Sequence, residues 1–373
     1  MYQDGHLGDA ENRLAAIEAG HPGIADVSHL RGVIALQRGY PDLAVAHLGR
    51  AVATDRRNPT LHHLLGVAFH ELGQTDDGIA AFRKAISIDA ANHETHYAMG
   101  NLQRDAGRFA DAVASYERAL DIDPGYTDAR YNLGLALSGL ERWDEACAAY
   151  EAVLAQTPDL MDAHNGLSKV LAMLRRCEDA ERHARAALAI SPDAIEAHNN
   201  LGHALQGLGR LDEAVESMNA ALALAPDNPD IHVNTGVIVE DWGQSQAAEA
   251  AFRRAIELAP NFAEAHFNLG GLLLRHGQYE EGWREYDWRW RRKDVPARPF
   301  RQPRWDGAGL AGKTILAWAD EGAGDEVQLA ALLPELIARA GTCIVECDAR
   351  LAPVFERSFP DAEIDARQPT PAK

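Results

Sequence analysis

Asparagine side chains recur at a fixed spacing through the middle of the chain. The row consists of Asn132, Asn200, Asn234 and Asn268, while Asn165 and Asn199 stand one position earlier in two of the repeated segments. A carboxamide both donates and accepts hydrogen bonds, so such a row could pair with the main chain of an extended polypeptide whatever its side chains. The alternative is that Asn-Leu-Gly is only a repeated structural consensus.

Histidines and carboxylates form two further columns with this spacing. The histidines are His62, His96, His164, His198, His232 and His266. The acids are Asp26, Glu94, Asp128, Asp162, Glu196, Asp230 and Glu264. A metal needs ligands that converge on one ion, whereas these histidines are separated by whole segments, so we interpret them as packing groups and predict no metal site. Acids in the first turn of a helix gain ~0.3–1 kcal/mol each from its dipole, and they would also favour a basic partner.

A glycine-rich turn near the C-terminal end carries another carboxylate. The pattern predicts a strand over 314–319, a helix over 326–340, a second strand over 343–347 and a helix near 349–358. This alternation is typical of a parallel α/β sheet, which binds ligands at the carboxyl ends of its strands. Gly322 and Gly324 allow a tight turn that brings Asp325 to that end of the first strand.

Residues 307–314 have the spacing of a phosphate-binding loop that ends in Lys313-Thr314. Such a loop must follow a strand and open a helix, because main-chain amides at the helix N-terminus hold the phosphate. Here a strand is predicted to follow the loop instead. The context therefore argues against nucleotide hydrolysis.

A period of 34 residues dictates the elements that carry these side chains. One column of small residues is Gly32, Gly66, Gly100, Gly134, Ser168, Gly202, Gly236 and Gly270, and prolines close five successive segments at Pro124, Pro158, Pro192, Pro226 and Pro260. Small residues let two helices approach closely, and proline ends the second helix. Each segment is therefore predicted to be a helix–turn–helix hairpin that must stack on its neighbours.

This pattern resembles the tetratricopeptide repeat. Eight repeats are predicted over 25–296, starting at Ala25, Pro59, His93, Thr127, Met161, Ile195, Pro229 and Ala263, and residues 1–24 fit only the second helix of a preceding repeat. The resemblance implies a mainly α fold, a right-handed superhelix or α-solenoid, whose first helices line the concave surface. The asparagine row is similar to the asparagine ladder with which O-linked N-acetylglucosamine transferases grip an extended protein substrate.

The tail resembles a bacterial group of repeat-linked, glycosyltransferase-like proteins. The resemblance rests on Glu281-Gly282-Trp283, on Trp305-Asp306-Gly307 and on the Gly324-Asp325 turn. It implies a Rossmann-like, GT-B-type lobe similar to heptosyltransferases over 297–366, with Asp325 as general base and a nucleotide-sugar as donor. The 79 residues from Val295 onward are roughly half of one such lobe, so we expect a catalytically incomplete segment and a disordered tail over 367–373.

Composition limits the classes of partner. The formal charge is −20, which argues against nucleic acid because phosphate binding needs a basic face. No apolar run reaches the ~20 residues of a membrane span, and four scattered cysteines favour a reducing compartment, so we expect a cytoplasmic protein. The arginines and tryptophans of 283–305 are interpreted as a cap on the repeat array, with phosphate binding as the alternative.

Two functions remain open from the sequence. The first is a scaffold that binds a protein or peptide in the concave groove, needs no cofactor and carries an incomplete transferase-like lobe. The second is the N-terminal part of an active glycosyltransferase. The sequence also predicts a weak repeat at 161–194, because Ser168, Arg175 and Ala184 replace two glycines and a large packing residue of the other repeats.

Overall fold

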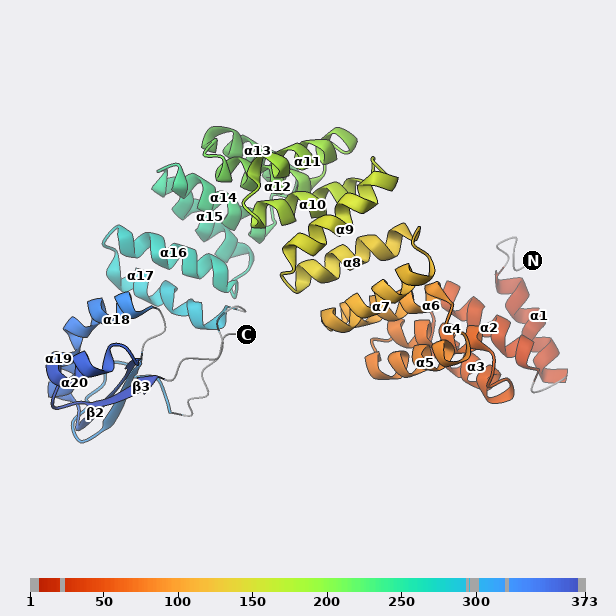
Figure 1. The fold of residues 1–373 in the computed structure, drawn as a ribbon, viewed down its shortest axis with the longest axis horizontal. Coiled ribbons are helices and arrows are strands. Elements are labelled where there is room, and N and C mark those ends of the chain that lie inside the picture. The colour runs from red at the N-terminus through yellow and green to blue at the C-terminus, as the bar shows by residue number, and fades with distance from the viewer. Residues whose placement is uncertain (1–6, 21–23, 293–294, 296–301, 319–321, 368–373) are drawn as a thin grey trace. The chain divides into compact units, whose positions relative to one another are not determined.

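The computed structural model describes residues 7–20, 24–292, 295, 302–318 and 322–367. The chain divides into two compact units, unit 1 over 1–295 and unit 2 over 296–373. Unit 1 is built from helices and unit 2 contains a small sheet (Figure 1).

Unit 1 is a stack of helix pairs. The first helices are α2 (Ala25–Gln37), α4 (Pro59–Glu71), α6 (His93–Asp105), α8 (Thr127–Gly139), α10 (Met161–Met173), α12 (Ile195–Gly207), α14 (Pro229–Asp241) and α16 (Ala263–Arg275). The second helices are α3 (Pro41–Thr54), α5 (Thr75–Ile88), α7 (Phe109–Ile122), α9 (Trp143–Gln156), α11 (Cys177–Ile190), α13 (Leu211–Leu224), α15 (Ser245–Leu258) and α17 (Tyr279–Tyr286). Helix α1 (Leu7–Gly20) precedes them, and the 3-10 helix η1 (Asp287–Arg291) follows.

Left-handed residues make the turn inside each pair. Six of these turns use glycine at φ between 69 and 80°, from Gly39 to Gly277. In two neighbouring repeats the same place is taken by Glu141 at φ 58° and Arg175 at φ 60°. The 34-residue period therefore fixes the backbone conformation even where the residue type departs from it.

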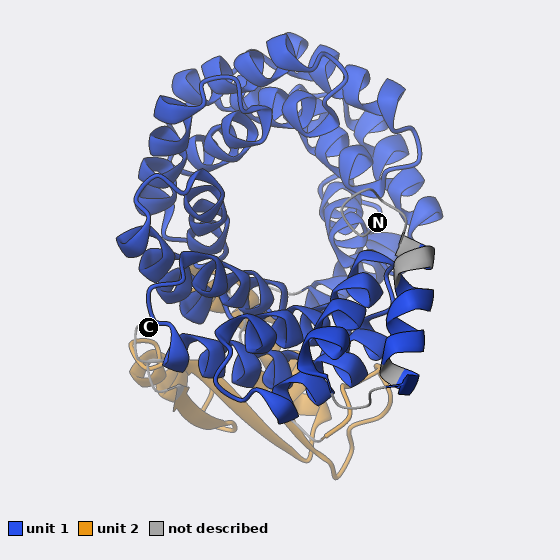
Figure 2. Cartoon of the chain, turned by 90° about the vertical axis from the view of Figure 1, so that its right-hand side faces the viewer, with its two compact units in different colours: residues 1–295 blue, residues 296–373 orange. Residues whose placement is uncertain are grey.

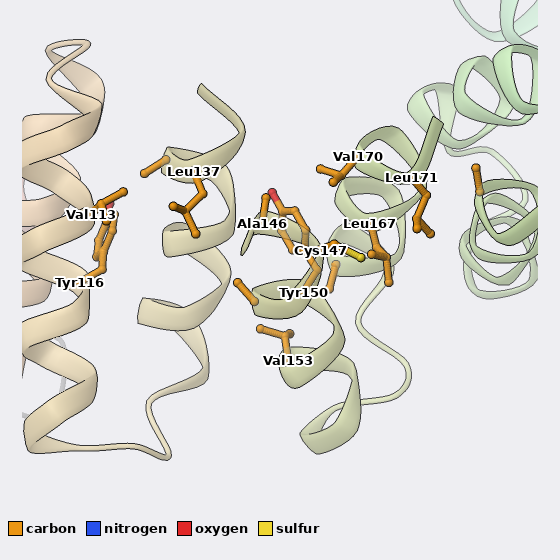
Figure 3. Close-up of a cluster of buried hydrophobic side chains, with 14 of the residues drawn as sticks. Val113, Tyr116, Leu137, Ala146, Cys147, Tyr150, Val153, Leu167, Val170 and Leu171 are labelled. Carbon is orange, nitrogen blue, oxygen red and sulfur yellow. The ribbon is translucent and has the colours of Figure 1, made fainter. Parts of the chain in front are cut away.

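The core of unit 1 is continuous across neighbouring pairs. One cluster of buried side chains runs from α7 through α8 and α9 to α10, and includes Tyr116, Leu137, Tyr150 and Leu167 (Figure 3). Close approach of the two helices in a pair depends on small residues. A Cβ on Gly134 would lie 2.8 Å from the ring of Tyr150, which no side chain tolerates without a shift.

The helices of unit 1 form two layers (Figure 2). First helices of successive repeats pack directly against each other, while second helices mainly contact the first helices beside them. In a curved stack the more closely spaced elements lie on the inner side. The first helices therefore line the inner face, which we define as the surface they turn away from the second helices.

Unit 2 is a three-stranded parallel sheet with short helices. Its strands, in spatial order, are β1 (Thr314–Trp318), β2 (Thr342–Asp348) and β3 (Glu363–Arg367). Leu316 pairs with Ile344, and Val345 pairs with Ile364. The helices are α18 (Ala323–Leu329), η2 (Ala330–Leu332), α19 (Leu333–Arg339) and α20 (Ala352–Ser358). Strand β3 was not predicted from the sequence, and it includes Arg367, which was assigned to the disordered tail; residues 368–373 lie outside the described residues. Thr314 begins β1, so the predicted loop leads into a strand and not a helix.

None of the helices that the structure describes is long and apolar enough to cross a bilayer.

Candidate functional site

The asparagine row lies on the inner face and links successive first helices. Asn200 Nδ2 donates to the main-chain oxygen of Asn165 at 3.2 Å, and Asn234 Nδ2 donates to Asn199 Oδ1 at 2.8 Å. Asn165, Asn199, Asn200 and Asn234 are half-buried. Each bond joins residues 35 apart and holds one amide in a fixed orientation. The remaining N–H and the Oδ1 of Asn200 and Asn234 have no protein partner among the described residues.

Asn132 differs from the rest of the row. Its side chain is 7% exposed, and its Nδ2 donates to the main-chain oxygen of Asp128 at 2.9 Å and to the Tyr97 hydroxyl at 3.1 Å. Its Oδ1 accepts from Arg104. The expectation that Asn132 presents its amide to a ligand is therefore not supported, because the packing between repeats already uses that amide.

Asn268 and Asn165 have unused hydrogen-bonding groups. Asn268 is half-buried and its side chain makes no hydrogen bond within the part of the chain that the structure describes. Asn165 Oδ1 is buried and has no partner there either. The Asn268 carboxamide is therefore free to pair with a main chain that approaches it, whereas Asn165 Oδ1 does not reach the surface.

Other polar pairs at the same separation reinforce the inner face. His70 Nε2 contacts Asp105 Oδ2 at 2.9 Å and Gln206 Nε2 donates to Asp241 Oδ2 at 2.6 Å. Arg275 pairs with Glu240 in the same way. Sequence reasoning missed these pairs, although complementary polar residues 35 apart are a signal that could have found them.

The histidine column has a structural role. Each Nε2 lies within 3.3 Å of the main-chain oxygen six residues earlier, as in His198 with Pro192 at 2.9 Å and His232 with Pro226 at 2.8 Å. Two repeats lack the histidine, and in one of them Arg130 makes the same contact to Pro124. Among the described residues, no three side chains of metal-ligating type gather at one point.

The acid column lies where the first helices begin. Asp26, Glu94, Asp128, Asp162, Glu196 and Asp230 are exposed, and their carboxylates have no hydrogen-bond or ion-pair partner among the described residues. Glu264 is the exception, because Arg292 lies 3.3 Å from it. A line of unpaired carboxylates therefore runs along one rim of the inner face.

The segment after α17 packs on the last first helix, α16. Trp288 stacks on His266 with ring centroids 3.9 Å apart. The guanidinium carbon of Arg291 lies 4.2 Å from the ring centroid of Trp288. Arg292 lies 4.4 Å from the ring centroid of Phe267. These described residues cover the end of the repeat array, as a cap does.

In unit 2, Asp325 is exposed in the first turn of α18. Its N–H donates to the oxygen of Gly322 at 3.0 Å, which closes the turn, and Gly324 is exposed beside it. The next residue, Glu326, is only 5% exposed and accepts a hydrogen bond from the Asp348 N–H at 2.7 Å. Sequence reasoning missed this link between the β1–α18 turn and the carboxyl end of β2.

Comparisons with known proteins agree with this architecture. Three family models described as tetratricopeptide repeat match the chain, the first at 29–93, 97–160 and 137–195, the second at 193–261 and the third at 251–284. Together these matches extend over more than half of the chain. The chain therefore belongs to the tetratricopeptide-repeat proteins.

Individual relatives cover parts of the chain. Protein FlbA of Caulobacter vibrioides is 36% identical over 102 residues, which are 26% of this chain and 17% of FlbA. A tetratricopeptide repeat protein from Parabacteroides merdae superposes with a TM-score of 0.55 at 17% identity, over 67% of this chain and 98% of its own. The APC/C hetero-tetramer Cut9-Hcn1 superposes with a TM-score of 0.52 at 17% identity, over 72% and 52%. At these identities the two structures share the fold alone.

Proposed function

We propose that the inner face binds an extended polypeptide through its main chain, which makes the chain a protein-interaction scaffold. Stacked-repeat proteins use their extended concave surfaces for binding. The observation that carries the proposal is that Asn200, Asn234 and Asn268 of the row, together with Asn199, keep unused amide donors or acceptors on consecutive first helices.

The spacing of the row suits an extended chain. Packed helices lie about 8–10 Å apart, and an extended polypeptide advances about 3.3 Å per residue. One repeat therefore corresponds to about three residues of ligand. Residues three apart would present a main-chain N–H or oxygen to each asparagine in turn.

The bonds between repeats favour binding because they orient the amides in advance. A side chain that is already held loses less conformational freedom when a ligand arrives. The rim of unpaired carboxylates would attract a partner that carries basic residues.

The cleanest test is a comparison between Asn268→Ala and the triple variant Asn200→Ala, Asn234→Ala and Asn268→Ala. At about 0.5–1.5 kcal/mol per hydrogen bond, the triple variant should bind peptides selected from a random twelve-residue library at least tenfold more weakly. Asn268→Ala alone should weaken binding without lowering stability, since it breaks no internal bond. Asn219→Ala with Asn261→Ala, both exposed, is the control. Unchanged binding by the triple variant would reduce the row to a structural consensus.

A second function is favoured by the turn that exposes Asp325 at the carboxyl end of β1. We propose that unit 2 is a Rossmann-like, GT-B-type lobe of a glycosyltransferase and that Asp325 acts as general base. The carboxylate would take the proton of an acceptor hydroxyl while its oxygen bonds to the anomeric carbon of a nucleotide-sugar, and the nucleoside diphosphate would leave with the electron pair of the broken bond.

The transferase proposal is tested with UDP-, GDP- and ADP-sugars in a product assay. Turnover that Asp325→Asn abolishes and Asp361→Asn retains would support it, since Asp361 is an exposed carboxylate of the same unit. Turnover that survives Asp325→Asn would assign the base elsewhere. A complete absence of turnover would leave the scaffold as the one supported function.

A further inference from the structure

Three aromatic rings gather on the rim of the inner face where α6 and α8 begin. Tyr126 lies 4.9 Å from Tyr97 and 5.1 Å from His93, measured between ring centroids, and its contact with His93 is edge-to-face. All three residues are half-buried, so part of each ring remains open to solvent. We call this group the rim aromatic cluster.

Two carboxylates flank the rim aromatic cluster. Glu94 follows His93 in the first turn of α6, and Asp128 opens α8 two residues after Tyr126. Both are exposed and neither has a side-chain partner among the described residues. Their field reaches the rings: burial, as the largest cause, together with Tyr97, Asp128, Glu94 and Asp123 raises the pKa of Tyr126 to about 12.

The repeat does not need an aromatic residue at position 126. The corresponding residues of the next two repeats are Leu160 and Ala194, and both precede a first helix with the same backbone geometry. In the seventh repeat an aromatic residue returns as Phe262, where it lines a shallow hollow with Pro229 and Asp230. The pairing of an aromatic ring with a first-turn carboxylate therefore occurs at two places on the rim.

We propose that the rim aromatic cluster, with Glu94 and Asp128, binds the side chain of a lysine or arginine in the polypeptide that occupies the inner face. The inference rests on the proposed scaffold function and names the chemistry of the partner. A cation over tyrosine faces is attracted by the ring quadrupole, and the two unpaired carboxylates supply the opposite charge. An arginine suits the site best, because its planar group stacks on a ring while its N–H groups reach a carboxylate.

The cluster also fixes where the cation stands in the ligand. Asn200 on α12 is two first helices beyond α8, and each repeat corresponds to about three extended residues. The basic residue should therefore lie roughly six to nine residues from the segment whose main chain pairs with the asparagines.

The test uses the random twelve-residue peptides selected on the full chain. We expect the selected peptides to carry a lysine or arginine at a constant position and to bind about fivefold more tightly than the same peptides with glutamine there. E94Q/D128N should remove this advantage. D77N/D212N should retain it, because it removes two exposed first-turn carboxylates of second helices and so matches the change in net charge and in helix dipole.

Tyr126→Leu is the second variant, because the repeat already accommodates leucine at Leu160. This variant should reduce the ratio of affinities between peptides with the basic residue and those with glutamine by half or more. Its helix content should be unchanged. An advantage that survives both E94Q/D128N and Tyr126→Leu overturns the proposal. Peptides that depend on Asn200, Asn234 and Asn268 but are indifferent to their basic residue overturn it while the scaffold function stands. If no peptide is selected at all, both fail.

Discussion

The repeats at 127–160 and 161–194 have the same backbone conformation but differ in the side chains that pack between their two helices. In the first, Gly134 faces the ring of Tyr150, and the aromatic side chain fills the space between the two helices. In the second, Ser168 stands in place of the glycine and Ala184 in place of the aromatic residue, and both are fully buried. Ser168 Oγ donates to the main-chain oxygen of Ala180 at 2.8 Å, so a hydrogen bond joins the two helices there.

The second repeat also uses a side chain of the first. A Cβ on Gly166 of α10 would lie 2.7 Å from Tyr150 Cζ, so the ring of α9 packs against first helices on both sides (Figure 3). A repeat judged only against its own consensus therefore looks weaker than it is. In a stacked array, the residue that fills a gap can come from the neighbouring repeat.

The largest expected effect comes from Tyr150→Ala. Tyr150 is 1% exposed, and truncating a buried aromatic side chain costs about 3–5 kcal/mol. If the ring serves two repeats, native-state amide exchange should accelerate in both 127–160 and 161–194. Tyr150→Phe, which keeps the ring, is the control. Acceleration confined to 127–160 would show that the contact with Gly166 contributes nothing.

Ser168→Ala should cost about 1 kcal/mol, the net value of one buried hydrogen bond. The matched change is Ser87→Ala in an earlier repeat, whose Oγ is exposed and donates to the main-chain oxygen of Lys84 at 2.7 Å within one helix. The denaturation midpoint should fall more for Ser168→Ala. Equal losses would mean that the bond between the helices is worth no more than a local one.

The period of the sequence predicted the repeats because small residues and prolines act locally, on one helix pair at a time. The sequence also predicted strands at β1 and β2, which contain runs of consecutive apolar residues, but not β3, where Ile364 and Ala366 are the only apolar residues of Glu363–Arg367. The bonds between residues 35 apart and the buried Glu326 were missed because they depend on which neighbour lies opposite. That 161–194 exchanges faster than its neighbours stays a prediction, and the contacts of Ser168 and Tyr150 reduce the difference we expect.

The two repeats should also differ in their response to pH. His164 Nδ1 lies 2.9 Å from His183 Nδ1, and His164 Nε2 contacts Pro158 O, so His183 is the donor in a neutral pair. Burial lowers the pKa of His183, and His164 and Arg182 lower it further, while Asp179 and Glu151 oppose them. The corresponding residues of 127–160 are Arg130 and Ala149, so that repeat has no histidine pair at this place.

Because the folded pKa of His183 lies below the unfolded value of about 6.5, the unfolded chain binds the proton first. The stability of 161–194 should therefore be full above about pH 6.5 and fall as the pH drops toward the folded pKa. Amide exchange at a series of pH values, corrected for intrinsic rates, measures this. His183→Ala, which copies Ala149, should flatten the dependence, and an unchanged dependence would locate the titration elsewhere.

The smallest expected effect concerns a feature that the two repeats share, the turn residues Glu141 and Arg175. Both hold positive φ angles, where a side chain costs about 1–2 kcal/mol. Glycine removes that strain but adds about 0.4–1 kcal/mol of unfolded-state entropy, so Glu141→Gly and Arg175→Gly should each raise stability by about 0.5–1 kcal/mol. The reverse change, Gly209→Ala at φ 72° in the next repeat, should lower it. Denaturant midpoints compare the three variants.

Arg175→Gly also loses the side chain beside Arg176, which pairs with Asp179 at 2.8 Å. A larger gain in stability there than at Glu141 would therefore indicate repulsion between the adjacent arginines. A loss in both glycine variants would mean that these turns are not strained, and that the two repeats tolerate non-glycine residues because their packing favours the left-handed turn.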